Sequence, residues 1–284
     1  MRLGIHCSIR NGLVSAVEEA KAIGCESMQI FTRSPRAWKT RSISDSEASE
    51  FKDALIKSDI HPLVVHTPYL PNLCSSNVEL YNRSMNALSE DIKRGAMLGG
   101  SYLIIHPGSY SEGKTEVEGT KQLIRALNVI TKEIPDDFMI LIETMAGGGR
   151  RLGNSFLWMR MVLDKLNRLE TVGFCIDTCH LYGAGYDLSK SDAGVILKRE
   201  IENTVTWDKV KVVHLNDSKA MLGSHKDMHQ HIGKGFIGIR GFREFINWPS
   251  VKKLTGILET PKDSENADRR NLTLLRKLDK SKIK

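Results

Sequence analysis

Residues 172–177 read VGFCID and lead directly into TCHL, residues 178–181. A run of roughly four to eight aliphatic and aromatic residues is typical of a strand that is buried on both faces. Asp177 ends this run, and His180 follows three residues later. The stretch therefore predicts a buried strand whose carboxyl end carries polar side chains.

Seven further runs of the same kind are distributed along the chain. They are LGIH (3–6), MQIF (28–31), LVVH (63–66), YLIIH (102–106), MILIE (139–143), VKVVHL (210–215) and GILE (256–259). Successive run ends lie between 25 residues (6 to 31) and 45 residues (214 to 259) apart, which suits one β-loop-α unit each. Eight such units predict an α/β protein with a single (β/α)8 TIM barrel. No linker interrupts them, so we expect one domain over residues 1–284.

Helix boundaries are marked between the runs. Two Ser-x-x-Glu segments, 44–47 and 76–79, fit the capping box that begins a helix. Gly24 and the glycine pair 99–100 fit helix ends, because glycine adopts the left-handed conformation that closes a helix. These boundaries support alternation of strand and helix.

The composition favours an intracellular protein that meets a polyanion. Lys and Arg number 41 against 34 Asp and Glu, a formal charge of +7, and residues 268–284 concentrate part of that charge. No apolar run has the length of a membrane span or a signal peptide. The five cysteines form no C-x-x-C pair, which favours a reducing compartment. We expect a monomer in the cytoplasm with no membrane partner; a nucleus or a virus factory stays open.

Seven of the eight runs end at or near a histidine, an aspartate or a glutamate. The active site of a β/α barrel lies at the carboxyl ends of its strands, so these side chains can meet. One strand-end histidine ordinarily finds a backbone partner, whereas a cluster of buried imidazoles and carboxylates is costly without a bound cation. The seven residues are His6, His66, His106, Glu143, Asp177, His214 and Glu259.

The segments after the sixth and seventh runs add further donors. His180 follows Asp177, and Asp227 and His229 lie two apart, so their side chains point the same way in an extended segment. His225 and His231 flank them, and spacing alone does not choose among these histidines. Imidazoles and carboxylates suit zinc, with manganese or iron open; a thiolate site at Cys175 and Cys179 is disfavoured without paired C-x-x-C knuckles.

Apart from His6 and the flanking loop histidines, nine donors remain, more than one ion can use, since catalytic zinc takes about three protein ligands. The sequence therefore predicts two or three metal ions.

Several segments resemble the successive motifs of the endonuclease IV family, in the family's order. They are GIHCS (4–8), FTRSPRAW (31–38), HTPYLPNL (66–73), IIHPGSY (104–110), ETMAGGG (143–149), GFCIDTCHLYGAGYD (173–187), HLNDSKAMLGSHKDMHQHIGKGFIG (214–238) and GILET (256–260). The resemblance covers residues 1–260 and beyond. It implies a TIM barrel nuclease.

The resemblance also implies three zinc ions, each held by its own group of ligands. The first group is His66, His106 and Glu143; the second is Glu143, Asp177, His214 and Glu259; the third is His180, Asp227 and His229. It places Asp227 and His229 on the family's D-x-H motif, which leaves out His225 and His231. His6 matches a family histidine that is not a ligand.

The implied activity is hydrolysis of the phosphodiester on the 5′ side of an abasic site in double-stranded DNA, leaving a 3′ hydroxyl, and removal of blocking groups from 3′ ends. Glu143 and Glu259 are the expected catalytic carboxylates. Three zinc ions per chain are the expected cofactor, with manganese open at part of the site. Arg36 and Tyr69, in the loops after the second and third runs, are the expected DNA contacts.

Two positions depart from the family pattern, and two other functions remain open. Gly148 stands where a glutamine is expected, and Ala37 where many members carry a bulkier polar residue; both affect loop shape rather than ligands. A sugar isomerase or epimerase would use only Glu143, Asp177, His214 and Glu259 to hold one ion. A lesion-binding barrel without catalysis would not need the full ligand set.

Overall fold

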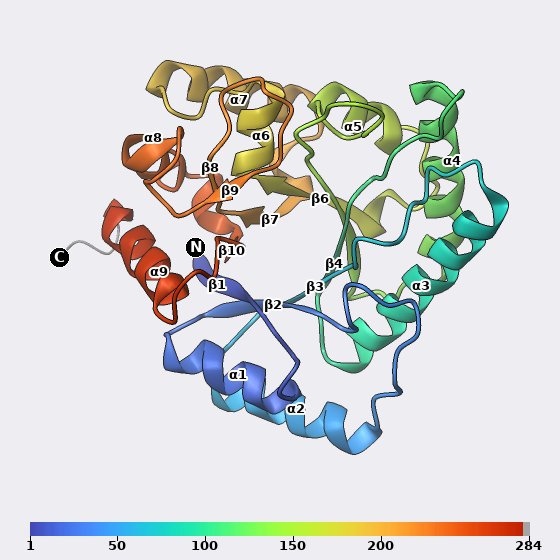
Figure 1. Ribbon diagram of the computed structural model, residues 1–284, viewed down its shortest axis with the longest axis horizontal. Coiled ribbons are helices and arrows are strands. Elements are labelled where there is room, and N and C mark those ends of the chain that lie inside the picture. Colours follow the sequence, from blue (N-terminus) through green and yellow to red (C-terminus); the bar gives the residue numbers. More distant parts are fainter. Residues whose placement is uncertain (281–284) are drawn as a thin grey trace.

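A computed structural model describes residues 1–280, so the last four residues of the basic C-terminal stretch and of the expected domain lie outside it. Eight parallel strands form a closed barrel in the order β1-β10-β7-β6-β5-β4-β3-β2. The helices surround the strands as an outer ring (Figure 1). The predicted single (β/α)8 barrel is confirmed, whereas the extent of one domain over 1–284 stays a prediction.

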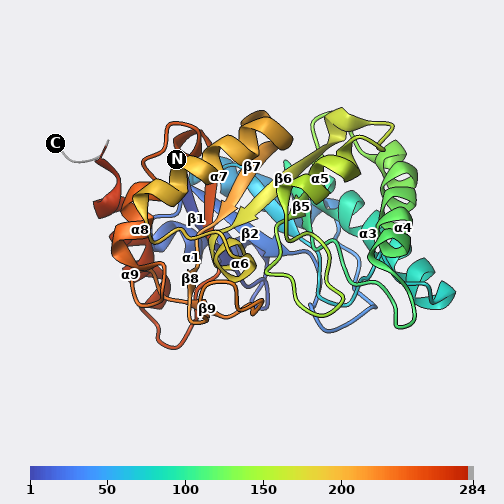
Figure 2. The same cartoon turned by 90° about the horizontal axis from the view of Figure 1, so that it is seen from above.

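The barrel strands coincide with the eight apolar runs. They are β1 (Arg2–Cys7), β2 (Ser27–Phe31), β3 (Leu63–His66), β4 (Tyr102–Ile105), β5 (Met139–Glu143), β6 (Val172–Asp177), β7 (Val210–His214) and β10 (Thr255–Leu258). Two short antiparallel strands, β8 (Asp217–Ser218) and β9 (His229–Gln230), form a separate ribbon. The ribbon lies beyond the ends of the barrel strands, beside α6 (Figure 2).

The helices fill the intervals between the strands. They are α1 (Leu13–Ala22), α2 (Asp45–Lys57), α3 (Val78–Met97), α4 (Glu116–Ile130), α5 (Phe156–Leu163), α6 (Thr178–Ala184), α7 (Ser191–Thr204), α8 (Gly238–Phe245) and α9 (Ala267–Leu278). Among residues 1–280, none of the helices combines the length and the apolar character needed to cross a membrane.

The helix boundaries agree with the sequence except at one start. The expected capping box at Ser44 is present, and Gly24 and Gly99 have the expected positive φ. The box expected at residues 76–79 is wrong: α3 is capped by Asn77, whose Oδ1 accepts from the Leu80 N–H at 2.9 Å. An asparagine caps as well as a serine does, so the helix starts one residue later.

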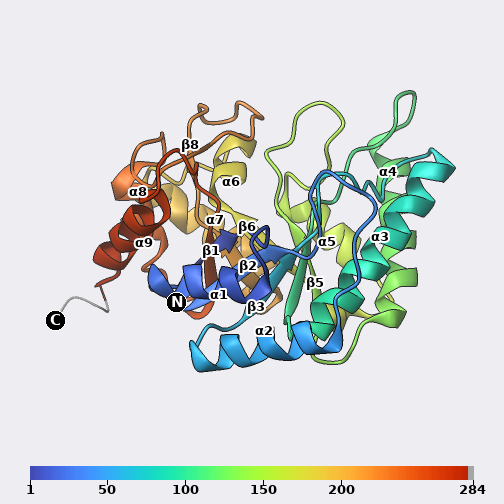
Figure 3. The same cartoon turned by 60° about the horizontal axis from the view of Figure 1, so that its bottom comes forward.

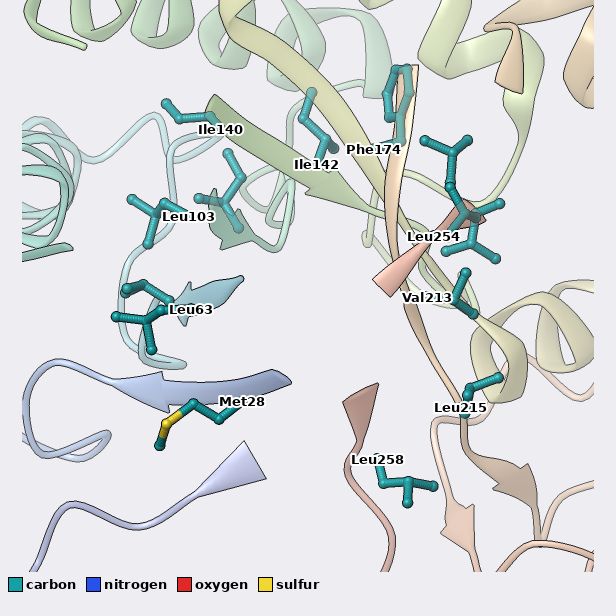
Figure 4. Close-up of a cluster of buried hydrophobic side chains, with 14 of the residues drawn as sticks. Met28, Leu63, Leu103, Ile140, Ile142, Phe174, Val213, Leu215, Leu254 and Leu258 are labelled. Atoms are coloured by element: carbon teal, nitrogen blue, oxygen red, sulfur yellow. The ribbon is translucent and has the colours of Figure 1, made fainter. Parts of the chain in front are cut away.

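Alternation along the strands produces two apolar layers. Side chains that point outward pack against the helices in one large cluster, which includes Met28, Leu103, Ile140 and Phe174 (Figure 4). Side chains that point inward form a second, smaller cluster at the barrel centre. Its members are Val64, Ile104, Leu141, Cys175, Val212 and Ile257, all fully buried.

Candidate metal centre

Each residue of the inner cluster lies two positions before one of the expected ligands. Because strand side chains alternate, the ligand occupies the next interior layer toward the carboxyl end. The six expected ligands are His66, His106, Glu143, Asp177, His214 and Glu259. The loops after β4, β5 and β7 rise above the helices on this side of the molecule (Figure 3). The barrel thus brings the strand ends and these loops to one place.

The first group of three side chains centres on one oxygen of Glu143. The Nε2 atoms of His66 and His106 both lie 3.1 Å from Glu143 Oε2. His66 and Glu143 are buried, and the side chain of His106 is 28% exposed. These three residues offer donor atoms close enough to hold one cation.

The second group contains four side chains around His214 Nδ1. This atom lies 3.1 Å from Glu143 Oε1, 3.2 Å from Glu259 Oε2 and 3.8 Å from Asp177 Oδ2. Glu143 therefore belongs to both groups, with one oxygen toward each. Three carboxylates around one imidazole nitrogen form a group that could hold a second cation.

The third group joins α6 to the ribbon and the loop before it. Asp227 Oδ2 lies 3.2 Å from His180 Nε2, and Asp227 Oδ1 lies 3.2 Å from His229 Nε2. Neither buried Nε2 atom has a hydrogen-bond partner among the described residues. Asp177 starts α6, since its Oδ1 accepts from the His180 N–H at 2.8 Å, and this contact fixes His180 above the strand end.

Backbone oxygens fix the orientation of three of the five imidazoles. The Nδ1 atoms of His66, His180 and His229 lie 2.7, 2.7 and 3.1 Å from the carbonyl oxygens of Thr67, Thr144 and Glu259. A carbonyl only accepts, so each Nδ1 donates a proton to it, and each Nε2, the ring nitrogen left to bind a cation, is turned toward the carboxylates. Such outer contacts are typical of metal-binding histidines.

The carboxylates create a strong preference for positive charge. Burial alone would lower the pKa of His180, but Asp177, Asp227 and Glu143 outweigh it and hold that pKa well above its usual value. Burial likewise would raise the pKa of Glu143, but His214 and His106 hold it well below its usual value. Glu143 is therefore ionised, and the site attracts cations.

The remaining loop histidines and the cysteine pair lie outside these three groups. His225 Nδ1 donates to the Ala146 carbonyl at 2.9 Å, and His231 Nε2 lies 2.9 Å from Asp263 Oδ2. Burial raises the pKa of both the Cys175 and the Cys179 thiols to about 12. Cys175 belongs to the inner apolar cluster, while Cys179 forms a further group of possible donors with Asp177 and His229, so the two thiols form no shared site within the described chain.

Of the two expected DNA contacts, Tyr69 lies beside the proposed metal centre and Arg36 lies on the loop after β2. Tyr69 is 70% exposed, and its ring lies 6.1 Å from that of His106. Arg36 is exposed on the loop after β2, and Trp38 on the same loop stacks on Arg83 with 4.5 Å between the guanidinium and the ring. Trp38 thus anchors the loop to α3, whereas Tyr69 and Arg36 project toward solvent.

The local structure explains why a glycine occupies position 148. Its φ is +87°, and a Cβ built there would lie 2.9 Å from the His225 carbonyl oxygen. The loop after β5 therefore packs directly on the loop that carries Asp227, and any side chain at this position would separate them. Ala37 donates its N–H to the Ser34 carbonyl at 3.3 Å within a turn.

Three side chains that support the site were missed by the sequence analysis. Asn216 Nδ2 donates to Asp177 Oδ2 at 2.7 Å, and its Oδ1 accepts from the Glu259 N–H. Thr144 Oγ1 accepts from the Asp177 N–H at 2.8 Å. Gln29 contacts both His214 and Glu259. Gln29 alone had a visible signal, as a polar residue at the centre of an apolar strand.

Similar sequences cover almost the whole chain. Residues 17–278 match the family described as "Xylose isomerase-like TIM barrel". The protein named "Probable endonuclease 4" from Halothermothrix orenii is 41% identical over 264 residues, 93% of this chain and 95% of the relative. The protein of the same name from Methanocorpusculum labreanum is 37% identical over 278 residues, 98% of this chain and 99% of the relative.

Solved structures agree with these sequences. Endonuclease IV from Thermus thermophilus has a TM-score of 0.85 and 35% identity, and the match covers 98% of both chains. The 3-keto-D-glucoside 4-epimerase of E. coli has a TM-score of 0.73 at 14% identity, over 98% of this chain and 99% of that one, which shows a shared fold alone. The resemblance found in the strand-end motifs is confirmed: the chain belongs to the endonuclease IV family of Xylose isomerase-like TIM barrels.

Proposed function

We propose that this protein is a DNA repair endonuclease that hydrolyses the phosphodiester 5′ to abasic sites, leaves a 3′ hydroxyl and clears blocked 3′ ends with three zinc ions. The observation that carries the proposal is the grouping of nine side chains into three sets of donors around the shared Glu143 and the adjacent Asp227. The relatives named endonuclease 4 and the Thermus endonuclease IV support a nuclease that acts on DNA.

The donor set fits zinc. All nine donors are imidazole nitrogens or carboxylate oxygens, and three of the imidazoles have their proton-bearing nitrogen fixed by a carbonyl. The buried Nε2 atoms of His180 and His229 have no hydrogen-bond partner among the described residues but lie 3.2 Å from the Asp227 oxygens, an arrangement that a cation between them would satisfy. The four carboxylates of the three groups also need compensating charge, and three divalent ions would leave the site with a net charge of about +2.

The metal ions and the protein side chains would have different roles in hydrolysis. Bound divalent ions lower the pKa of water and stabilise charge on a phosphodiester. Glu143, with one oxygen toward each of two groups, sets the spacing between those groups, and Glu259 completes the second group. The imidazoles of His66, His180 and His229 turn Nε2 toward the carboxylates because backbone carbonyls occupy their Nδ1 atoms.

Two cavities border this centre and suit a nucleic acid. One of about 310 Å³ is lined by residues that include Tyr69, His106, Arg151 and Asp227. Another of about 630 Å³ is lined by cations from several elements, Arg10, Arg33, Lys39, Arg41, Arg94 and Lys262. Phosphates would approach the basic cavity, while Tyr69 and Arg36 could fill the gap left by an expelled abasic nucleotide, which has no base to unpair.

The sugar isomerase alternative explains less of the site. It uses Glu143, Asp177, His214 and Glu259 and gives no role to His180, Asp227 and His229, although these also form a donor group. The non-catalytic alternative gives no reason for nine donors to remain in place. The likeness to the epimerase concerns the fold alone.

An incision assay tests the proposal. A duplex with one abasic-site analogue is incubated with the wild type in EDTA, with zinc restored, and with Glu259→Gln. We expect incision only by the zinc-loaded wild type, and a loss of at least about 100-fold for Glu259→Gln because the second group loses a charged ligand. Glu79→Gln, a substitution of an 82% exposed glutamate on α3, serves as the matched control and should cleave normally. No incision by zinc-loaded wild type would refute the proposal.

A further inference from the structure

Gln29 is a buried polar residue beside the apolar layer of the barrel that lies beneath the proposed metal ligands. In strand register it stands opposite Val64 on one side and His6 on the other. Val64 belongs to the inner apolar cluster, which six of the eight strands form. Gln29 is fully buried, and an amide placed there costs free energy unless its hydrogen bonds are made.

Both the amide nitrogen and the amide oxygen of Gln29 have hydrogen-bond partners in the proposed metal centre or beside it. Its Nε2 lies 2.6 Å from Glu259 Oε1 and 2.9 Å from His6 Nδ1. Its Oε1 lies 2.8 Å from His214 Nε2. One side chain on β2 thus contacts groups on β1, β7 and the end of β10.

The orientation of the amide follows from its partners. The Glu259 carboxylate only accepts hydrogen bonds, so the NH2 group must face it, and the carbonyl oxygen must then face His214 Nε2. That oxygen also only accepts, so His214 Nε2 carries a proton. A neutral ring protonated at Nε2 has its lone pair on Nδ1, the atom that lies 3.1–3.8 Å from Glu143, Glu259 and Asp177.

We propose that Gln29 is a positioning residue that selects the His214 tautomer and orients Glu259, and so sets the affinity of the second ligand group for its metal ion. The other fixed imidazoles obtain the same effect from backbone carbonyls. His214 ends β7 at the barrel centre, and its Nε2 atom contacts the side-chain oxygen of Gln29 instead of a backbone carbonyl. This inference rests on the proposed zinc centre and deepens it.

The test compares zinc retention in the wild type, Gln29→Met and Ser27→Ala. Methionine keeps the length of the side chain and removes the amide. Ser27 is a fully buried neighbour on the same strand, and its hydroxyl has no hydrogen-bond partner within residues 1–280. Zinc-loaded protein is titrated with a chromogenic chelator. We expect one of three ions in Gln29→Met to be released at chelator concentrations about 10–100-fold lower than in the wild type, with the other two unchanged. Ser27→Ala should match the wild type.

A second measurement needs no variant. The ¹⁵N shifts of the His214 ring in zinc-loaded wild type should show a proton on Nε2 and metal on Nδ1; a proton on Nδ1 would overturn the proposal even if Gln29→Met fails to fold. Wild type that takes up no zinc would refute the metal centre and this role together. Three ions in the wild type and equal retention in a folded Gln29→Met would refute the role of Gln29 alone.

Discussion

At the scale of single residues, Tyr69 gives the clearest prediction about DNA. Tyr69 is 70% exposed beside His106, a position where its ring can stack on a nucleotide without supporting the core. Base–aromatic stacking contributes about 1–3 kcal/mol, so Tyr69→Ala should raise KM for abasic DNA roughly 10-fold or more, while Tyr69→Phe retains most binding. Steady-state incision kinetics measure this. Leu157→Ala, on the outer face of α5 and 71% exposed, is the control. An unchanged KM in Tyr69→Ala would mean that the ring does not contact DNA.

Some residues of the site could be predicted from the sequence, and others could not. Strand-end ligands could be predicted because alternation and barrel topology force their side chains together. The choice of Asp227 and His229 over His225 and His231 needed the family resemblance, because spacing does not reveal that His225 bonds to Ala146 and His231 to Asp263. Gln29 and Asn216 were missed because their role depends on which ring nitrogen or carboxylate oxygen they reach, and that is a property of three-dimensional packing.

At the scale of elements, the loop after β5 packs on the loop that carries Asp227, and this contact requires a glycine at position 148. Gly148→Ala should lower the free energy of unfolding by about 1–3 kcal/mol, because it combines a positive φ with a Cβ only 2.9 Å from the His225 carbonyl oxygen. Gly149→Ala is the matched control, since Gly149 also has a positive φ, +58°, but open space around it. Urea denaturation of both variants isolates the packing contribution. Equal losses would show that the loops do not need this contact.

A contact with α3 also holds the loop that carries Arg36. Buried Arg33 donates to Asp91 Oδ1 at 2.8 Å on α3 and to the carbonyl oxygen of Trp38 at 3.1 Å. Asp91→Ala should destabilise the protein by about 3–5 kcal/mol in urea denaturation, because it leaves a buried guanidinium without its main partner. Glu90→Ala removes a half-exposed partner 3.2 Å from Arg33 and should cost less than about 1 kcal/mol. Similar losses for the two variants would contradict the anchoring role of Asp91.

At the scale of the whole molecule, metal and fold should be coupled. The proposed ligands come from six barrel strands or their ends, from α6 and from the ribbon and the loop before it, so bound ions would link much of the barrel. An ion present at about 1,000 times its Kd stabilises the folded state by about 4 kcal/mol. Removal by EDTA should therefore lower Tm by at least about 8 °C, and added zinc should restore it. A Tm that EDTA does not change would indicate that the three ligand groups bind no metal ion that stabilises the fold. The monomeric state and the cytoplasmic location stay predictions.

The proposed reaction breaks the phosphodiester on the 5′ side of the lesion, and the ends of the product show which bond was cut. A duplex with one abasic-site analogue and a 5′ label on the damaged strand is cleaved by zinc-loaded protein, and a DNA polymerase with nucleotides is then added. We predict a labelled fragment that ends at the nucleotide before the lesion and is extended at once, because it carries a 3′ hydroxyl. A fragment that retains the lesion sugar at its 3′ end, or one that the polymerase cannot extend, would contradict the account.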